Sequence, residues 1–187
     1  MGIESDYDLW AKTYDHNDNS TRDLDFVLSQ KILGDGYYKS VLELGCGTGK
    51  NTQWLAPICD YCLSVDFSAG MLAQAKIKCT APHVTFERCD LSTAWSFKKT
   101  DFDLALVNLV LEHLVDLDSF MKQVSIHLRP GGRLLVCELH PCRQYQGSQA
   151  QFETESGVTE LEVYTHHISE YVGSAKRNRL RLLDVDE

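Results

Sequence analysis

The sequence lacks a long apolar run. No uninterrupted apolar stretch approaches the ~18 residues that a membrane-spanning helix needs. The first residues, MGIESDYDLW, are acidic and do not show the basic-then-apolar order of a secretory signal. We therefore expect a soluble protein of the cytoplasm that has no membrane partner.

Positive charge is also scarce. The 187 residues carry 18 basic and 27 acidic side chains, so the formal net charge is −9. This charge repels polyanions over most of the surface, which disfavours nucleic acid as a partner. The one basic cluster, KRNRLR at 176–181, is typical of a solvated helix end, and we assign it no function.

The cysteines do not form a disulfide or metal pattern. Seven cysteines are an odd number and fit reduced thiols. Cys59 and Cys62 form a C-x-x-C pair, but the second pair of a zinc ribbon is absent. A site can be drawn from His140, Cys142 and the His166–His167 pair, yet neighbouring residues on a helix point in different directions. We expect no metal.

Short apolar runs alternate with segments of helical spacing. The five runs, which we predict to be strands, span residues 40–45, 61–67, 84–90, 102–108 and 132–139. Helices are predicted at 68–78 and 116–128. This alternation is typical of an α/β fold with a doubly wound, mostly parallel sheet and helices on both faces. No repeat or linker divides the chain, so we expect one domain over 1–187.

The two ends of the chain give weaker signals. Residues 5–17 place Tyr7, Trp10 and Tyr14 on one face of a helix, which either packs on the domain or covers a ligand. After the fifth strand, a helix is predicted at 166–176 and a sixth strand at 180–185.

A glycine loop follows the first predicted strand, in VLELGCGTGKNT at 41–52. Its glycines at 45, 47 and 49 let a ligand approach the backbone where open α/β folds bind ligands. The dinucleotide pattern G-x-G-x-x-G needs its third glycine at position 50, which is Lys50 here. A pyrophosphate loop is thus disfavoured, and a nucleotide-dependent oxidoreductase is the weakest of the functions that we consider.

Carboxylates accompany the ends of the first three strands, at Glu43, Asp66 and Asp90. Glu43 beside the loop favours a ligand with positive charge. Asp66 follows Gly45 by 21 residues, where an acidic side chain binds the hydroxyls of a ribose. Together these features predict a site for a nucleoside that bears an amino acid.

Five segments resemble the class I S-adenosylmethionine-dependent methyltransferases of the small-molecule type. They are VLELGCGTG, VDFSAGMLAQAK, CDL, FDLALVNLVLEHL and LRPGGRLLVCELH, within about residues 5–140. The resemblance implies a Rossmann-like fold, S-adenosylmethionine as cofactor, S-adenosylhomocysteine as product and a small-molecule acceptor. It also divides the domain into an N-terminal helical lid (1–38), a cofactor-binding core (39–140) and a substrate region with the final strand (141–187).

The resemblance also assigns roles to residues. The glycine loop would pack against the methionine part of the cofactor, Asp66 would hold the ribose, and Asp90 with the Leu91 amide would contact the adenine edge. The implied cofactor-binding residues are Tyr14, Glu43, Gly45, Cys46, Gly47, Gly49, Asp66, Phe67, Met71, Asp90, Leu91, Asn108 and Leu109.

Catalysis and acceptor binding are predicted from position. His113 follows the fourth strand and is our candidate for a general base, with Glu112 beside it; either residue could equally have no catalytic part. The candidate substrate residues are Tyr7, Trp10, His140, Tyr164 and His166.

The end of the chain departs from the family. Class I methyltransferases add an antiparallel seventh strand, whereas this chain stops at LRLLDVDE. We expect that strand to be missing, in a monomer or a homodimer. Either the strand order is locally altered, a partner chain fills the gap, or the sheet edge is exposed. A non-catalytic cofactor-binding or regulatory domain of the same fold is therefore the alternative to an active enzyme.

Overall fold

A five-stranded sheet forms the centre of the protein. The structure is a computed structural model that describes residues 2–16, 18–154 and 157–187. The strands are β1 (Val41–Leu44), β2 (Cys62–Asp66), β3 (Val84–Arg88), β4 (Phe102–Asn108) and β5 (Leu128–Cys137). Their order is β3-β2-β1-β4-β5, and all four pairings are parallel. The five predicted strands and their parallel arrangement are confirmed.

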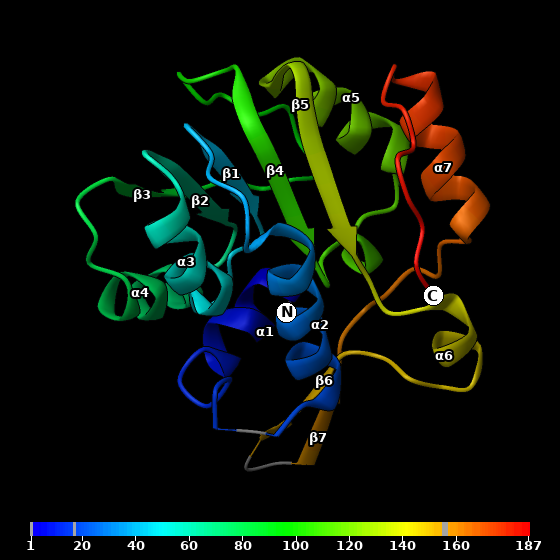
Figure 1. Cartoon of the computed structure of the whole chain (residues 1–187). Coiled ribbons are helices and arrows are strands. Elements are labelled where there is room, and N and C mark those ends of the chain that lie inside the picture. The colour runs from blue at the N-terminus through cyan, green and yellow to red at the C-terminus, as the bar shows by residue number, and fades with distance from the viewer. Residues whose placement is uncertain (1, 17, 155–156) are drawn as a thin grey trace.

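The order of the strands creates a switch point beside β1. The chain runs outward from β1 through β2 to β3, then crosses back to place β4 on the other side of β1 (Figure 1). In such sheets, ligands bind at the carboxyl ends of the strands where the order reverses. The loop that follows β1 therefore lies where a ligand is expected.

Helices cover both faces of the sheet (Figure 1). On one face α5 (Leu117–His127) and α7 (Ile168–Arg177) pack on a core that includes Leu42 and Leu44. On the other face α2 (Ser20–Leu33) and α3 (Lys50–Leu55) pack on residues that include Val41. Neighbouring side chains of β1 thus enter opposite layers, which explains why the predicted strand is apolar throughout.

Side-chain caps fix where two predicted helices begin. Ser68 caps α4 (Ala69–Lys78), since its Oγ accepts a hydrogen bond from the Met71 amide at 3.0 Å. Asp116 caps α5 by accepting from the amides of Asp118 and Ser119, both at 3.0 Å. Such caps satisfy amides that the helix itself leaves unpaired.

The C-terminal region differs from the prediction. The helix predicted at 166–176 is confirmed as α7, but the sixth strand predicted at 180–185 is wrong: the structure has no strand there. Leu182 and Leu183 are 53% and 64% exposed, so the side chains of this apolar run are not buried against the sheet. Two strands that were not predicted, β6 (Gln151–Thr154) and β7 (Gly157–Glu160), form an antiparallel pair.

The N-terminal segment packs against the β6–β7 pair near the carboxyl end of the sheet. The ring of Trp10, at the end of α1 (Ile3–Trp10), stacks on Phe152 of β6 with a centroid distance of 5.1 Å. Ala11, Met71 and Leu161 complete this apolar cluster. The remaining short helices are η1 (Ala56–Ile58), η2 (Leu111–His113) and α6 (Pro141–Tyr145). Within the described ranges, no helix is both long and apolar enough to cross a membrane.

Candidate active site

The glycine loop joins β1 to α3. Gly45, Gly47 and Gly49 have φ angles of 77°, 52° and 83°, which lie in the left-handed region that favours glycine. A Cβ on Gly45 would lie 2.2 Å from Val110 Cγ2, and one on Gly49 would lie 3.0 Å from Ala75 Cα. A Cβ on Gly47 would meet nothing within 4 Å. The outer two glycines therefore permit close packing of the chain, whereas Gly47 faces open space that a ligand could use.

Asp66 holds this loop from the end of β2. Its Oδ2 accepts a hydrogen bond from the Gly47 amide at 2.8 Å, and its Oδ1 accepts from the Ser68 amide at 2.9 Å. Burial raises the pKa of Asp66 to about 6, although the backbone hydrogen bonds oppose that shift. A carboxylate in this environment would gain stability from a positively charged ligand or from hydroxyl donors.

Glu43 lies inside the domain, next to the start of the loop. Its Oε2 accepts hydrogen bonds from Thr52 Oγ1 and Ser64 Oγ, both at 2.6 Å. The residue is 3% exposed, and burial raises its pKa to about 7. Glu43 thus ties β1 to α3 and β2, and it can influence a ligand through its charge.

Asn108 carries an unsatisfied oxygen at the end of β4. Its Nδ2 donates to Ser29 Oγ at 2.8 Å and also to Asp25. Its Oδ1 is buried and has no hydrogen-bond partner within the described part of the chain. Leu109 follows with φ at 55°, a turn in the backbone. Because a buried acceptor without a partner is costly, the ammonium group of an amino acid would be a fitting ligand for Oδ1.

Three further residues of the predicted cofactor set, Asp90 and Leu91 after β3 and Cys46 in the glycine loop, differ in their exposure. Asp90 is exposed, and its Oδ1 accepts from the amide and the hydroxyl of Ser92 at 2.9 and 2.6 Å. Leu91 is buried in the main core. Cys46 of the glycine loop is also buried, which raises the pKa of its thiol well above the usual range.

Aromatic side chains of α1 contact two residues that follow β2. Met71 is 1% exposed and packs in the cluster of Trp10 and Phe152. The ring of Phe67 contacts the ring of Tyr7 edge-on, with centroids 5.5 Å apart. α1 therefore contacts two of the residues that the family resemblance assigns to cofactor binding.

A cavity of about 580 Å³ lies between the N-terminal segment and the chain after β5. Its lining includes Tyr14 and Leu109 from the predicted cofactor residues, and Tyr7 and Trp10 from the predicted substrate residues. Two members of each predicted set therefore meet at one cavity. Lining residues that the sequence analysis did not select include Arg22, Arg143, Gln149 and Phe152.

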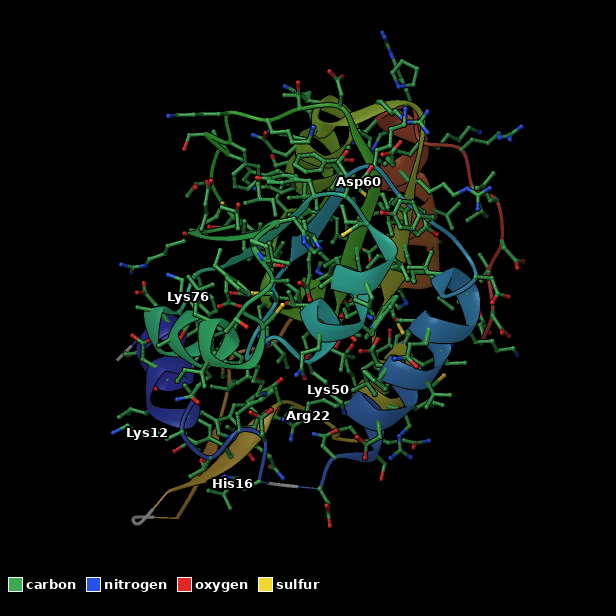
Figure 2. All side chains as sticks on the ribbon, turned by 60° about the vertical axis from the view of Figure 1, so that its left-hand side comes forward. Lys12, His16, Arg22, Lys50, Asp60 and Lys76 are labelled. Carbon is green, nitrogen blue, oxygen red and sulfur yellow. The ribbon has the colours of Figure 1, made fainter. Side chains whose placement is uncertain are left out.

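Arg22 shows why some lining residues were missed. Its Nη1 donates to the Tyr14 carbonyl at 2.6 Å, and its guanidinium lies 4.1 Å from the centre of the Tyr14 ring. Figure 2 shows Arg22 near Lys50 and far from Asp60, which precedes β2 at the opposite end of the sheet. No motif marks Arg22 in the sequence; only its position near the start of a helix in the lid region could have suggested a role.

His113 forms a hydrogen bond with a residue of α1. Its Nε2 lies 2.8 Å from the Tyr7 hydroxyl, and its Nδ1 lies 3.1 Å from the Glu162 carbonyl oxygen. Burial lowers the pKa of His113, which favours the neutral imidazole. Glu112 is also buried, and its pKa is raised; its Oε2 accepts from Gln144 Nε2 at 3.2 Å.

The other predicted substrate residues lie outside the cavity lining. His166 is buried and donates from Nε2 to the Leu114 carbonyl at 2.7 Å. Tyr164 donates to Glu162 Oε1 at 3.0 Å, and His140 Nδ1 accepts from the Cys142 amide at 3.1 Å at the start of α6. These polar groups bind other parts of the chain.

The fold and the site together define an α/β domain with a glycine loop and a buried carboxylate at the carboxyl end of β1. The sequence model of the family described as "Methyltransferase domain" matches residues 42–136, which is half of the chain. The chain belongs to this methyltransferase family, as its resemblance to class I methyltransferases implied.

Among curated relatives, the chain is 33% identical over 110 residues to a demethylmenaquinone methyltransferase from Mycolicibacterium paratuberculosis. The match covers 59% of this chain and 46% of that protein. The chain spans about half the length of the curated relatives that it matches.

Solved structures share the fold. One is an S-adenosylmethionine-dependent methyltransferase from Clostridium acetobutylicum, with a TM-score of 0.71, 19% identity and coverage of 94% of this chain and 87% of that one. Another is the N-methyltransferase NodS from Bradyrhizobium japonicum in complex with S-adenosylhomocysteine, with a TM-score of 0.71, 19% identity and coverage of 95% and 86%. The predicted Rossmann-like class I methyltransferase fold is confirmed.

Proposed function

We propose that the chain binds S-adenosylmethionine and transfers its methyl group to a small-molecule acceptor, with S-adenosylhomocysteine as product. The observation that carries the proposal is the open space at Gly47, which has the buried Asp66 carboxylate on one side and lies at the switch point of the sheet. Family membership and the S-adenosylhomocysteine complex of NodS support the choice of this nucleoside.

The residues around the loop fit the chemical groups of the cofactor. Gly45, Cys46, Gly47 and Gly49 would contact its methionine part, and Glu43 would support the loop from the core. The orphaned Asn108 Oδ1 fits the amino group of the methionine part, with Leu109 next to it. The sulfonium of the bound cofactor supplies an activated methyl group.

The adenosine would lie between β2 and β3. Asp66 would accept hydrogen bonds from the ribose hydroxyls, and Phe67 and Met71 would flank the adenine ring. Asp90 binds Ser92 through Oδ1, and we propose that its other oxygen and the Leu91 amide contact the adenine edge. Because Tyr7 and Trp10 cover Phe67 and Met71, the lid must shift before the nucleoside can enter.

The cavity of about 580 Å³ would hold the acceptor, since residues of the proposed lid line it together with Leu109, which directly follows β4. Tyr14 would close over the cofactor, while Tyr7 and Trp10 would contact the acceptor; His140, Tyr164 and His166 would contribute only if α6 and the following chain rearranged. Transfer is an in-line displacement in which positioning is worth up to roughly 7–11 kcal/mol. His113 is the proposed general base for an acceptor that must lose a proton.

Location and assembly complete the proposal. All seven cysteines are unpaired thiols, which suits the reducing cytoplasm. We expect a monomer or a homodimer, and light scattering during gel filtration would separate these two states.

Binding and turnover test the proposal separately. Calorimetry of the purified chain should give micromolar affinity for S-adenosylmethionine and S-adenosylhomocysteine. Methyl transfer from labelled S-adenosylmethionine to a panel of hydroxyl, amine and thiol acceptors should then be detectable. Binding without any transfer would favour the alternative, a non-catalytic cofactor-binding or regulatory domain.

A further inference from the structure

The hydrogen-bond pattern defines the tautomer of His113. A carbonyl oxygen can only accept, so the Nδ1 atom that lies 3.1 Å from the Glu162 carbonyl must carry the proton. Nε2 is then an acceptor when the ring is neutral, and the hydroxyl 2.8 Å away must be the donor. The Tyr7 hydroxyl therefore donates to His113 Nε2.

Tyr7 stands between this imidazole and the cavity. Tyr7 is part of the cavity lining, whereas His113 is not among the described residues of that lining and its side chain is only 10% exposed. The rings of Tyr7 and His113 meet edge-on, with centroids 5.5 Å apart. A proton that leaves a molecule in the cavity would thus reach the Tyr7 oxygen before it could reach the base.

The surroundings of Tyr7 and His113 favour the protonation states that a proton relay needs. Burial raises the pKa of Tyr7, and the charges of Glu112, Asp66 and Glu138 oppose its ionisation further, as does Tyr14. Burial lowers the pKa of His113. At neutral pH the phenol is protonated and the imidazole is neutral, so the pair can pass on one proton.

We propose that Tyr7 and His113 form a proton relay, and that the acceptor presents a hydroxyl-type oxygen (an alcohol, a phenol or an enol) to the Tyr7 hydroxyl. This inference rests on the proposed function and extends it to the substrate class. Tyr7 is the group that contacts the acceptor, and His113 acts through it.

The proposed step conserves protons and electrons. The acceptor oxygen forms a bond to the methyl carbon, and the bond from that carbon to sulfur breaks and leaves its electron pair on sulfur. The acceptor proton moves to the Tyr7 oxygen while the Tyr7 proton moves to His113 Nε2. The resulting imidazolium releases its proton to water after the product leaves.

Glu112 is the competing base. Its Oε1 lies 3.9 Å from His113 Nε2, and the residue lines the same cavity. Gln144 already donates to its other oxygen. If Glu112 accepted the proton directly, the Tyr7 hydroxyl would be dispensable.

Nitrogen NMR of the histidine rings tests the geometry without any acceptor. The full-length chain at neutral pH should show His113 as the neutral Nδ1–H tautomer, and Tyr7→Phe should shift its Nε2 resonance. Tyr37→Phe is the matched control, because Tyr37 is 67% exposed and donates to Asp60 near the opposite end of the sheet. An Nε2–H tautomer, or a resonance that Tyr7→Phe does not move, would overturn the relay.

Kinetics tests the function. With the hydroxyl acceptor identified in the panel, Tyr7→Phe and His113→Asn should each lower the transfer rate by about 10²- to 10⁴-fold. An ionised thiol acceptor should lose less than about threefold, because it has no proton to transfer. The transfer rate should fall as pH is lowered, because protonated His113 cannot accept a proton. This fall should follow the His113 titration measured by NMR. An unchanged transfer rate in Tyr7→Phe would contradict the relay. So would a large loss of rate in Glu112→Gln without a comparable loss in Tyr7→Phe and His113→Asn.

Calorimetry separates the two proposals. Tyr7→Phe should keep S-adenosylhomocysteine affinity within about threefold of the wild type, since no relay group binds the nucleoside. If the wild-type chain failed to bind that nucleoside, the proposed function itself would be wrong. If binding persisted and transfer did not depend on Tyr7, only the relay would be wrong.

Discussion

The Asp66 carboxylate accepts a hydrogen bond from the Gly47 amide at 2.8 Å. This contact joins the end of β2 to the middle of the glycine loop, beside the proposed nucleoside position. One carboxylate thus both holds the loop and would bind the ribose.

Asp66→Ala should weaken S-adenosylmethionine binding at least tenfold, because charge-assisted hydrogen bonds are worth roughly 1.5–3 kcal/mol. Calorimetry measures the change. Asp35→Ala is a suitable control, since Asp35 is exposed and precedes β1. Equal affinity in Asp66→Ala and the wild type would remove Asp66 from the site.

Gly45→Ala and Gly47→Ala should separate folding from binding. At Gly45 a left-handed backbone combines with a Cβ only 2.2 Å from Val110 Cγ2, so unfolding should become easier by about 2–4 kcal/mol. At Gly47 the new methyl group enters open space, and only ~1 kcal/mol of backbone strain is expected.

Thermal unfolding measures the stability of the two variants, and calorimetry measures their affinity for S-adenosylmethionine. Gly47→Ala should keep most of the stability and lose S-adenosylmethionine affinity, because the methyl group occupies the space that we assign to the ligand. A Gly47→Ala chain that binds normally would show that the ligand does not approach the loop there.

Glu43 should make the ligand-free protein less stable as pH rises. Burial raises its folded-state pKa to about 7 from the ordinary 4.5, so the folded chain holds a proton that the unfolded chain has already lost. The stabilising effect is complete below pH 4.5 and is lost as pH rises to about 7. The full change is on the order of 3 kcal/mol.

Denaturant unfolding between pH 4 and 8 measures this effect. Glu43→Gln keeps an oxygen that can accept from Thr52 and Ser64 but does not titrate. Its stability should therefore decline less steeply over this pH range than that of the wild type. Parallel profiles for the two chains would show that Glu43 titrates normally.

Asp8 should control how tightly the lid is held. Its Oδ1 accepts from Ser68 Oγ at 2.6 Å and from the Gly70 amide at 2.8 Å, so it joins α1 to the start of α4. Asp8→Ala should speed hydrogen exchange in α1 and leave the amides of β1 and β4 protected. Unchanged exchange in α1 would mean that its aromatic contacts alone hold the lid.

Local patterns in the sequence predict most of the core. The five strands were predictable because each contains a short apolar run, and β1, β2 and most of β4 are buried between helices. The helices predicted at 68–78 and 116–128 start at Ser68 and Asp116, which cap α4 and α5 in the structure; a cap depends on neighbours in the sequence.

The region after β5 was not predictable in the same way. β6 and β7 are largely polar and pair only with each other, and Phe152 connects them to Trp10, a residue distant in the sequence. Residues 180–185 have the apolar content of a strand but belong to neither of the sheets in the described part of the chain. Tertiary contacts determine both outcomes, and a local pattern does not contain them.

The same distinction applies to the site. The glycine loop and Asp66 follow predicted strands, so the topology of a parallel sheet brings them together. Tyr7 and His113 form a pair only because α1 folds over the sheet. Their separate selection from the sequence gave no sign of the hydrogen bond between them.

The central claim is that the open space at Gly47 binds a sulfur nucleoside. The most direct measurement is calorimetry of the purified chain with S-adenosylmethionine, S-adenosylhomocysteine and NAD in parallel. We predict micromolar binding of both sulfur nucleosides, weakened by Gly47→Ala, and none of NAD. Absence of sulfur-nucleoside binding, or equal binding of NAD, would contradict the account.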